Sequence, residues 1–375
     1  MKVLHLLSNW KWTGPAEPAL ETAALLDRSP GVRVVLAHTG RTRGEEENYV
    51  AREAERLGLR RLPGLELPRH FSLATLGRDS GRLAACLDGE DFDLLHCHLK
   101  NDHLTAALAR LRGRSTPPVV RTWYDPEGPR GWREAWLVRR ATAGAILPGR
   151  RARDRVARKG RGRIALETAL PPLDLERFSP AGADMRSRYL AEPGDFLAGV
   201  VARIQPHRKW DLLLAAFRRA LASRPELKLV VIGRGEGWES DLYGPARAMG
   251  VAERLVMAGY RREEEYDGSL RSLDCIIFLQ PGSDGTCRAL RQGLAVGLPA
   301  LVTRRGLLPE LVRDGETGFL VDEEPGALAT ALVRLAADRE LARSLGRAAR
   351  EEAEVRYAPE RYLELLLSLY RRVVR

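Results

Sequence analysis

The sequence contains few cysteines and no long apolar run. Only four cysteines occur among 375 residues, and none of them forms a Cys-x-x-Cys pair. This excludes the cysteine spacing of a zinc ribbon and favours a protein of a reducing compartment over a disulfide-stapled one. No stretch reaches the roughly 18 consecutive apolar residues of a membrane-spanning helix. The first residues turn polar too soon for a secretory signal, which favours a cytoplasmic location.

Signatures of dinucleotide cofactors, nucleic acid and metal are also missing. No Gly-x-Gly-x-x-Gly follows a predicted strand, and the fragment GRGEGW at 233–238 has the wrong spacing, so an NAD enzyme is disfavoured. Aromatic residues do not interleave with the arginines, and we expect no nucleic-acid partner. His96 and His98 flank Cys97, but on a strand the cysteine would face the other way. We therefore predict no metal site there.

Positive charge, by contrast, is abundant. The formal net charge is +11, and 55 of the 61 basic residues are arginine. The densest run, residues 139–163, has ten basic side chains and one acidic side chain. One interpretation is peripheral contact with an anionic membrane on its inner face, since basic clusters attract acidic headgroups. The other is a general preference for arginine that has no membrane role.

Short apolar runs alternate with helical patterns in two successive series. KVLHLLS, VRVVLAH and FDLLHCH belong to the first series, and FLAGVVAR, KLVVIG and CIIFLQ belong to the second. A segment rich in proline, glycine and charge begins near residue 171 and separates them. We therefore predict two α/β domains with parallel sheets, residues 1–172 and 173–356, facing a ligand-binding cleft. The last helix, within 357–375, should pack back toward the first domain.

The first strand runs into a loop that contains glycine and two tryptophans, SNWKWTGP. Pro15 suits the first turn of a helix, and Thr13 or Gly14 would cap it. A helix amino terminus at this sheet edge attracts anions, so Gly14 is a candidate residue for binding an anionic ligand. Trp10 and Trp12 would either stack on an acceptor sugar or lipid, or pack against the first helix.

The second domain has cationic residues where its first strand ends, in VVARIQPHRKW. Arg203 follows the strand directly, and Arg208 and Lys209 come just before a helix. Cations that converge in this way suit a diphosphate, because arginine pairs bidentately with phosphate oxygens. A solvated loop without a ligand is the alternative.

The stretch SDGTCRALRQGLAVGLPALV, residues 283–302, predicts a helix that begins around Thr286. Asp284 would lie at its cap, and Gln292 about two turns further on. Both side chains could then address one elongated ligand. The peptide groups of Gly285 and Thr286 would face its phosphates.

These segments resemble the retaining glycosyltransferases of family four, which have the GT-B fold of two Rossmann-like domains. The resemblance rests on VARIQPHRKWDLL, DGTCRALRQGLAVGLPAL and PELVRDGETGFLV, which occur in the family's order and at its separations, and on LDLERFSP before the second domain. The motifs of the second domain are specific, whereas the first domain matches mainly in layout. The resemblance implies transfer of a sugar from a UDP- or GDP-linked donor to a glycan or lipid-linked acceptor, without a metal or another cofactor.

The resemblance also implies roles for single residues. Arg203 and Arg208 would hold the donor diphosphate, Asp284 would touch the donor sugar, and Gln292 would hold the nucleotide ribose. Tyr124 stands where many family members carry a histidine that approaches the transferred sugar. Retention in the family is described as attack on the same face of the sugar, with the acceptor proton passing to the leaving phosphate.

The chain departs from the family pattern at several of these positions. Asp284 and Gln292 both replace glutamate, and Gly14-Pro15 stands where two glycines are usual. The departures fit a subfamily with another donor or acceptor. They also fit a member that binds a nucleotide sugar without turning it over, or an epimerase of the same fold.

Two residues of the first domain complete the predicted site. His98 at a strand end would help to position an acceptor, or would be a buried structural histidine. Asn101, just beyond it, would lie on the acceptor side.

Overall fold

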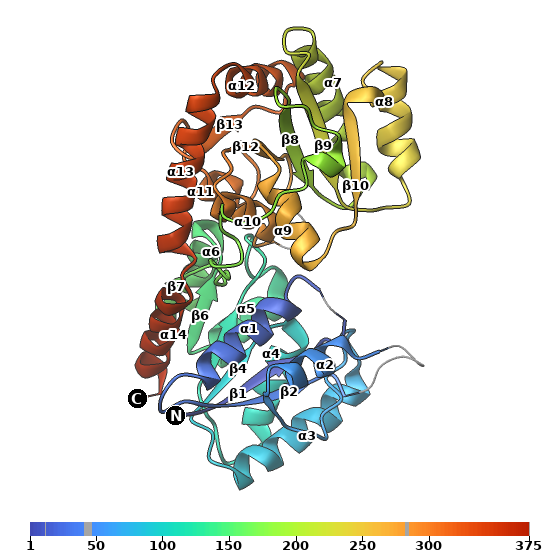
Figure 1. Cartoon of the computed structure of the whole chain (residues 1–375). Coiled ribbons are helices and arrows are strands. Elements are labelled where there is room, and N and C mark those ends of the chain that lie inside the picture. Colours follow the sequence, from blue (N-terminus) through green and yellow to red (C-terminus); the bar gives the residue numbers. More distant parts are fainter. Residues whose placement is uncertain (12, 41–46, 282–284, 375) are drawn as a thin grey trace. The chain divides into compact units, whose positions relative to one another are not determined.

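The computed structural model describes residues 1–11, 13–40, 47–281 and 285–374. The chain forms two compact units (Figure 1). The first unit comprises residues 1–172, 283–286 and 359–375, and the second comprises residues 173–282 and 287–358. Among the described helices, none is both long enough and apolar enough to cross a bilayer.

The first unit is built on a seven-stranded sheet of the order β3-β2-β1-β4-β5-β6-β7, in which every pairing is parallel. Its strands are β1 (Lys2–Leu7), β2 (Arg33–His38), β3 (Arg60–Arg61), β4 (Leu94–Cys97), β5 (Val119–Thr122), β6 (Gly144–Leu147) and β7 (Ala165–Thr168). The strand order changes direction between β1 and β4. The connections that follow these two strands therefore leave in opposite directions, and the crevice between them is where sheets of this kind bind ligands.

Helices cover both faces of this sheet (Figure 1). They are α1 (Ala16–Asp27), α2 (Tyr49–Arg56), α3 (Leu73–Gly89), α4 (Lys100–Arg112), α5 (Gly131–Ala141), α6 (Arg150–Gly160) and α14 (Pro359–Val373). Alternate residues of β1 enter two different cores. Val3 and Leu7 pack with α1 and α14, whereas Leu4 and Leu6 pack with α3 and α4. This alternation is the period of two expected of a strand that is buried on both faces.

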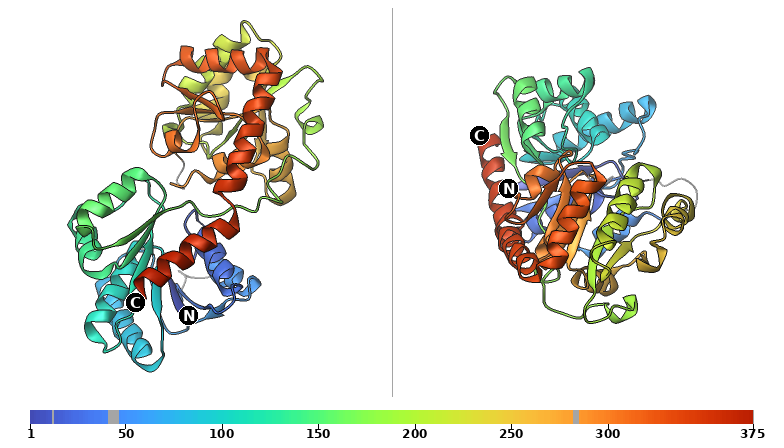
Figure 2. Two further views of the ribbon diagram at one scale, coloured as in Figure 1. Left: turned by 90° about the vertical axis from the view of Figure 1, so that its left-hand side faces the viewer. Right: turned by 90° about the horizontal axis from the view of Figure 1, so that it is seen from above.

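The C-terminal helix α14 is part of the first unit. It packs on α1, β6 and β7, and Figure 2 shows it lying along that unit. Its apolar stripe of Tyr362, Leu366 and Leu369 is buried in the same core as β1. Spacings of three and four residues put these side chains on one helix face, so one turn after another is covered.

The second unit has a six-stranded sheet of the order β10-β9-β8-β11-β12-β13, again parallel throughout. The strands are β8 (Phe196–Val201), β9 (Leu227–Ile232), β10 (Leu255–Gly259), β11 (Cys275–Phe278), β12 (Ala300–Thr303) and β13 (Gly318–Val321). The order changes direction between β8 and β11. The two units thus repeat one doubly wound topology, and the predicted pair of Rossmann-like sheets is confirmed.

The helices of the second unit are α7 (Trp210–Leu221), α8 (Gly244–Ala248), α9 (Glu263–Arg271), α10 (Arg288–Val296), α11 (Leu308–Leu311), α12 (Pro325–Ala337) and α13 (Arg339–Arg356). Strands β8 and β9 form one core with α7 and α12. Gly297 ends α10 with a φ of 89°, a left-handed conformation that glycine adopts without strain.

Candidate functional site

In the second unit, the predicted phosphate-binding residues lie beyond the carboxyl end of β8, beside the reversal of strand order. Arg203 follows the end of β8 and is exposed. Arg208 belongs to the short 3₁₀ turn Pro206–Arg208, immediately before α7. It also lines a small cavity together with the end of β11 and with Leu279 and Gln280, which follow that strand. Ligands of open parallel sheets bind at this edge.

Arg208 is a half-buried cation in an unfavourable environment. Burial lowers the pKa of its guanidinium, and the nearby charge of Arg203 lowers it further. Its Nη1 donates to the carbonyl of Pro281 over 3.4 Å, and its buried Nε has no partner among the described residues. Both effects disfavour the charged form, so a bound anion would relieve both. The two arginines therefore form a candidate anion site.

The positive charge of Lys209 is partly offset by a carboxylate of the same unit. Its Nζ lies 3.9 Å from the carboxylate of Glu323, which is also paired with Arg305. The backbone of Lys209 is left-handed, with a φ of 62°, at the point where the 3₁₀ turn gives way to α7. The role of Lys209 as a phosphate ligand stays a prediction.

Helix α10 begins two residues later than the sequence suggested. Its first residue is Arg288, and Cys287 precedes it in a left-handed conformation with a φ of 52°. The prediction of a start at Thr286 was therefore wrong, because the turn at Cys287 separates that residue from the helix. Asp284 lies outside the described residues.

Gln292 lies on α10 and is buried. Its Oε1 accepts a hydrogen bond of 2.8 Å from the hydroxyl of Tyr266 on α9. This bond orients the amide and leaves its donor nitrogen, Nε2, as the group for a ligand hydroxyl. The ring of Tyr266 also packs edge-on against the ring of Phe178, in the same unit, with ring centres 6.4 Å apart. This packing helps to hold Tyr266 in place beside Gln292.

Gly285 packs against Tyr124 within the first unit. A Cβ at Gly285 would lie 2.3 Å from the backbone carbonyl oxygen of Tyr124 and 2.8 Å from Cδ of Pro126. A side chain would collide with backbone there, so the position requires glycine. Two predicted site residues that are far apart in the sequence are thus neighbours.

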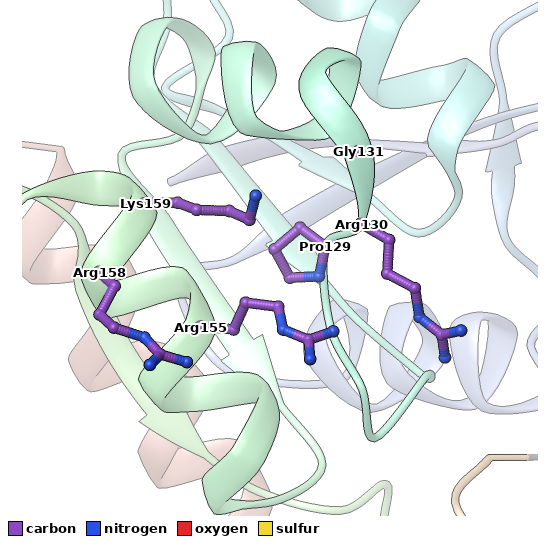
Figure 3. Close-up of a pocket in the computed structure, with 6 residues that line it drawn as sticks. All are labelled: Pro129, Arg130, Gly131, Arg155, Arg158 and Lys159. Carbon is purple, nitrogen blue, oxygen red and sulfur yellow. The ribbon is translucent and has the colours of Figure 1, made fainter.

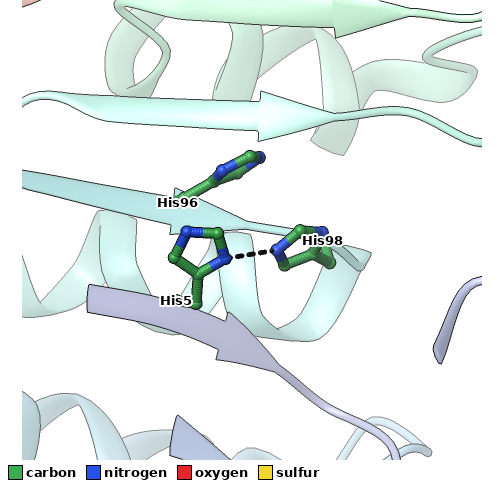
Figure 4. A group of neighbouring side chains, drawn as sticks. All are labelled: His5, His96 and His98. Atoms are coloured by element: carbon green, nitrogen blue, oxygen red, sulfur yellow. Dashed lines mark hydrogen bonds between the residues drawn. The ribbon is translucent and has the colours of Figure 1, made fainter. Parts of the chain in front are cut away.

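The reversal between β1 and β4 in the first unit holds three buried histidines (Figure 4). His5 on β1 is in register with His96 on β4, and His98 follows β4. Nδ1 of His5 and Nε2 of His98 are 2.9 Å apart, and Nε2 of His5 has no partner among the described residues. Cys97 packs on the opposite face of the sheet, as predicted.

Hydrogen bonds to hydroxyls occupy most of the other ring nitrogens of this cluster. His96 bonds to the hydroxyls of Tyr370 over 2.5 Å and Thr122 over 2.8 Å. His98 bonds to the hydroxyl of Tyr124 over 2.8 Å. One ring nitrogen from each of the three histidines lies within 4.8 Å of the others, which is close enough to hold a metal ion. In this structure the rings are hydrogen-bonded within the cluster or to neighbouring hydroxyls.

Burial fixes the protonation states around this cluster. It lowers the pKa of His5 to about 3 and the pKa of His96 and His98 well below 6.5. It raises the pKa of Tyr124 well above 10. The histidines are therefore neutral near pH 7, and Tyr124 is a phenol that can donate or accept one hydrogen bond but does not act as a base.

The glycine loop after β1 differs in detail from the prediction. Helix α1 begins at Ala16, with Pro15 at the cap position and Gly14 in the turn before it. Trp10 is buried, and its ring lies 4.3 Å from Nζ of Lys11. Of the two predicted alternatives for Trp10, its burial favours packing within the protein over a surface that stacks on an acceptor. Trp12 lies outside the described residues.

The side chain of Asn101 on α4 makes hydrogen bonds within the protein. Its Nδ2 donates to the carbonyls of Pro68 and Arg69, over 2.9 Å in each case. These bonds tie the segment before α3 to the start of α4. His5 was the residue of this edge that the sequence analysis missed. The sequence showed only a histidine within the apolar strand KVLHLL. The pairing of β1 with β4 is what places this histidine beside His96.

Two doubly wound parallel units, each with its ligand edge at a reversal of strand order, define the GT-B class. Two family models match the chain: "Glycosyltransferase Family 4" over residues 19–177 and "Glycosyl transferases group 1" over residues 183–352. The chain belongs to the family-four glycosyltransferases.

Curated relatives are similar over half of the chain. A D-inositol 3-phosphate glycosyltransferase of Streptomyces avermitilis is 35% identical over 205 residues, which are 52% of this chain and 44% of the relative. A GDP-mannose-dependent alpha-(1-6)-phosphatidylinositol monomannoside mannosyltransferase of Mycolicibacterium smegmatis is 33% identical over 207 residues, which are 50% of this chain and 52% of the relative. The matched part therefore spans about half the length of these relatives.

Solved structures share the fold over nearly the whole chain. Anabaena Alr3699/HepE in complex with UDP has a TM-score of 0.77 at 16% identity, and covers 98% of this chain and 99% of that one. A glycosyltransferase from Rickettsia africae has a TM-score of 0.81 at 14% identity, and covers 100% of this chain and 98% of that one. At these identities the likeness establishes the GT-B fold alone.

Proposed function

We propose that the protein transfers a sugar from a nucleotide diphosphate donor to a glycan or lipid-linked acceptor, with retention of configuration and without a metal ion. The observation that carries the proposal is the Arg203–Arg208 pair beyond β8. The guanidinium of Arg208 is half-buried, its Nε has no partner among the described residues, and a like charge lies beside it, so it is suited to a diphosphate. The similarity to a D-inositol 3-phosphate glycosyltransferase and to a GDP-mannose-dependent phosphatidylinositol monomannoside mannosyltransferase supports this class of reaction.

The chemistry follows from where charge develops. The acceptor hydroxyl attacks the anomeric carbon, the bond from that carbon to the diphosphate oxygen breaks, and the hydroxyl proton passes to the leaving diphosphate. Arg203 and Arg208 would stabilise the charge that appears on the leaving group, which is the part a metal plays in other enzymes. Gln292 would bind a ribose hydroxyl through Nε2, because Tyr266 already uses its oxygen.

The donor proposal is tested by melting the protein in the presence of UDP-, GDP- and ADP-linked sugars. A ligand that binds only the folded state raises the melting temperature with its concentration. We expect one nucleotide series to do so, and a chelator to leave both binding and turnover unchanged. The absence of a shift with every donor would overturn the proposal. A shift without turnover would instead assign a non-catalytic nucleotide-sugar-binding role.

A peripheral contact with an anionic membrane on the cytoplasmic side is part of the same proposal. A lipid-linked acceptor lies in a bilayer, so its enzyme has to reach that surface. The basic run 139–163, which includes the end of α5 and all of α6, supplies the positive charge. Such charge attracts acidic lipids within a Debye length.

A further inference from the structure

The beginnings of α3 and α5 expose large apolar side chains. Trp132 and Trp136, one turn apart on α5, are 76% and 37% exposed. Phe71 and Leu73, at the start of α3, are 52% and 74% exposed. Single exposed apolar residues are ordinary, but a group of them marks an interaction site. We call these four side chains the aromatic face.

The aromatic face is one surface and not two. The guanidinium carbon of Arg133 lies 5.3 Å from the ring centre of Trp132 and 5.5 Å from that of Phe71. One cation thus joins α5 to the segment just before α3. The bonds from Asn101 to the carbonyls of Pro68 and Arg69 hold the segment that leads to Phe71.

A basic pocket adjoins the aromatic face at the residue before Trp132 (Figure 3). It has a volume of about 390 Å³. Its lining residues are Pro129, Arg130, Gly131, Arg155, Arg158 and Lys159. Every charged side chain among them is basic, and Figure 3 shows Arg155 and Lys159 extending from α6 toward Pro129.

Two carboxylates near the pocket offset only part of this charge. Asp125 lies 3.2 Å from Nη2 of Arg130. Glu127 is shared, at 2.6 Å from Nη1 of Arg151 and 3.3 Å from Nη2 of Arg155. Arg158 and Lys159 make no ion pair with any described residue. The pocket therefore keeps net positive charge for an anion.

We propose that the aromatic face and the basic pocket together dock the protein on a bilayer that contains anionic phospholipid. Trp132 and Phe71 enter the interface, and a lipid phosphate occupies the pocket. Tryptophan favours the headgroup level of a bilayer, and basic side chains add attraction to acidic lipid. A soluble phosphate ester would explain the pocket but leaves four exposed apolar side chains without a use. This inference rests on the proposed lipid-linked acceptor.

The aromatic face lies on the side of the first unit at which a ligand is expected. Helices α3, α4 and α5 all follow strands of a parallel sheet, so their first turns lie at its carboxyl edge. The aromatic face is thus on the side of the sheet at which the carboxyl ends of β1 and β4 lie. Within the basic run 139–163, β6 is internal, and the part that meets the pocket is the second half of α6. A lipid-linked acceptor would therefore arrive next to the edge at which it is needed.

The test measures co-sedimentation of the full chain with vesicles of phosphatidylcholine, with and without phosphatidylglycerol. The double variant Phe71→Ala/Trp132→Ala removes the aromatic contact, and Arg158→Ser/Lys159→Ser removes pocket charge. Trp238→Ala, an exposed tryptophan of the second unit, is the matched control. We expect binding to the anionic vesicles only, a loss of about tenfold or more for the aromatic variant, a salt-dependent loss for the pocket variant, and wild-type binding for the control.

Three results would overturn the inference: no binding of the wild type to anionic vesicles, wild-type binding by the aromatic variant, or an equal loss in the Trp238→Ala control. If glycerol phosphate competes for the pocket while the aromatic variant binds vesicles normally, the pocket is a site for soluble phosphate. The melting shift with a nucleotide sugar, measured on each variant, reports folding and donor binding separately. Vesicle binding without a donor shift would refute the proposed function and leave the docking surface standing.

Discussion

Several titratable side chains are buried at the carboxyl ends of β1 and β4. Three histidines and Tyr124 are neutral there because charged forms are poorly solvated inside the sheet layer. His98 and Tyr124 are bonded to each other, which keeps the phenol in one orientation. Both were predicted as site residues from the sequence. Their mutual hydrogen bond was not predicted, because it depends on how β4 and β5 pair.

The pH dependence of stability follows from these pKa values. The histidines take up protons near pH 6.5 when unfolded, but His5 does so only near pH 3 when folded. They therefore stabilise the fold above pH 6.5, and this stability is lost as the pH falls toward 3. Asp102 acts in the opposite direction, because burial raises its pKa to about 7 and its contribution falls as the pH rises from 3.8 to 7.

We expect His5→Phe to flatten the acid side of the stability profile. One fewer proton taken up on unfolding lowers the slope by up to about 1.4 kcal/mol per pH unit between pH 6 and 4. Urea unfolding at a series of pH values gives both slopes. Parallel profiles for wild type and variant would show that His5 already binds its proton in the folded protein.

Removing Arg203 should weaken donor binding. Charge-assisted hydrogen bonds to the diphosphate contribute about 1.5–3 kcal/mol, so Arg203→Ala should raise the dissociation constant by roughly 10- to 150-fold. Calorimetric titration with the nucleotide sugar measures the change. Arg343→Ala is the control, because Arg343 is an exposed arginine of the same unit. Equal affinities for the two variants would move the diphosphate site elsewhere.

Helices α10 and α14 show which features of an element the sequence pattern can predict and which it cannot. The apolar stripe of α14 could be read from the spacing of Tyr362, Leu366 and Leu369, since it repeats with the helix period. The start of α10 could not, because the left-handed turn at Cys287 involves a residue type that rarely adopts it. Trp10 was equally ambiguous, since an aromatic beside a helix start can face either way. Its burial is decided by tertiary packing.

Truncating the stripe of α14 should destabilise the first unit. Leu369 is fully buried in the core with β1, so Leu369→Ala leaves a cavity and should cost about 2–5 kcal/mol of unfolding free energy. Val355→Ala, on the exposed face of α13, should change it by less than about 0.5 kcal/mol. Chemical denaturation compares the two. Similar values would mean that α14 contributes little to that core.

For the whole molecule, topology was the most predictable feature. Alternating strand and helix patterns, broken once near residue 171, are enough to imply two parallel sheets, since parallel strands need helical crossovers. Candidate donor residues of the second unit could be proposed from the sequence, because the ends of predicted strands precede them directly. The acceptor side could not be assigned from the sequence, because the burial of Trp10 and the hydrogen bonds of Asn101 to the carbonyls of Pro68 and Arg69 depend on tertiary packing.

The whole reaction should retain the anomeric configuration of the donor. A donor sugar linked in the α configuration should give an α-linked product, because attack occurs on the face that the diphosphate leaves. Proton NMR of the product identifies the anomer by its coupling constant. An inverted product would require a base opposite the leaving group, and would contradict the proposed mechanism.

The most direct test of the central claim is a crystal structure of the protein with UDP. We predict that the diphosphate contacts the side chains of Arg203 and Arg208 beyond the end of β8, with the ribose near Gln292. A diphosphate bound away from both arginines would contradict it.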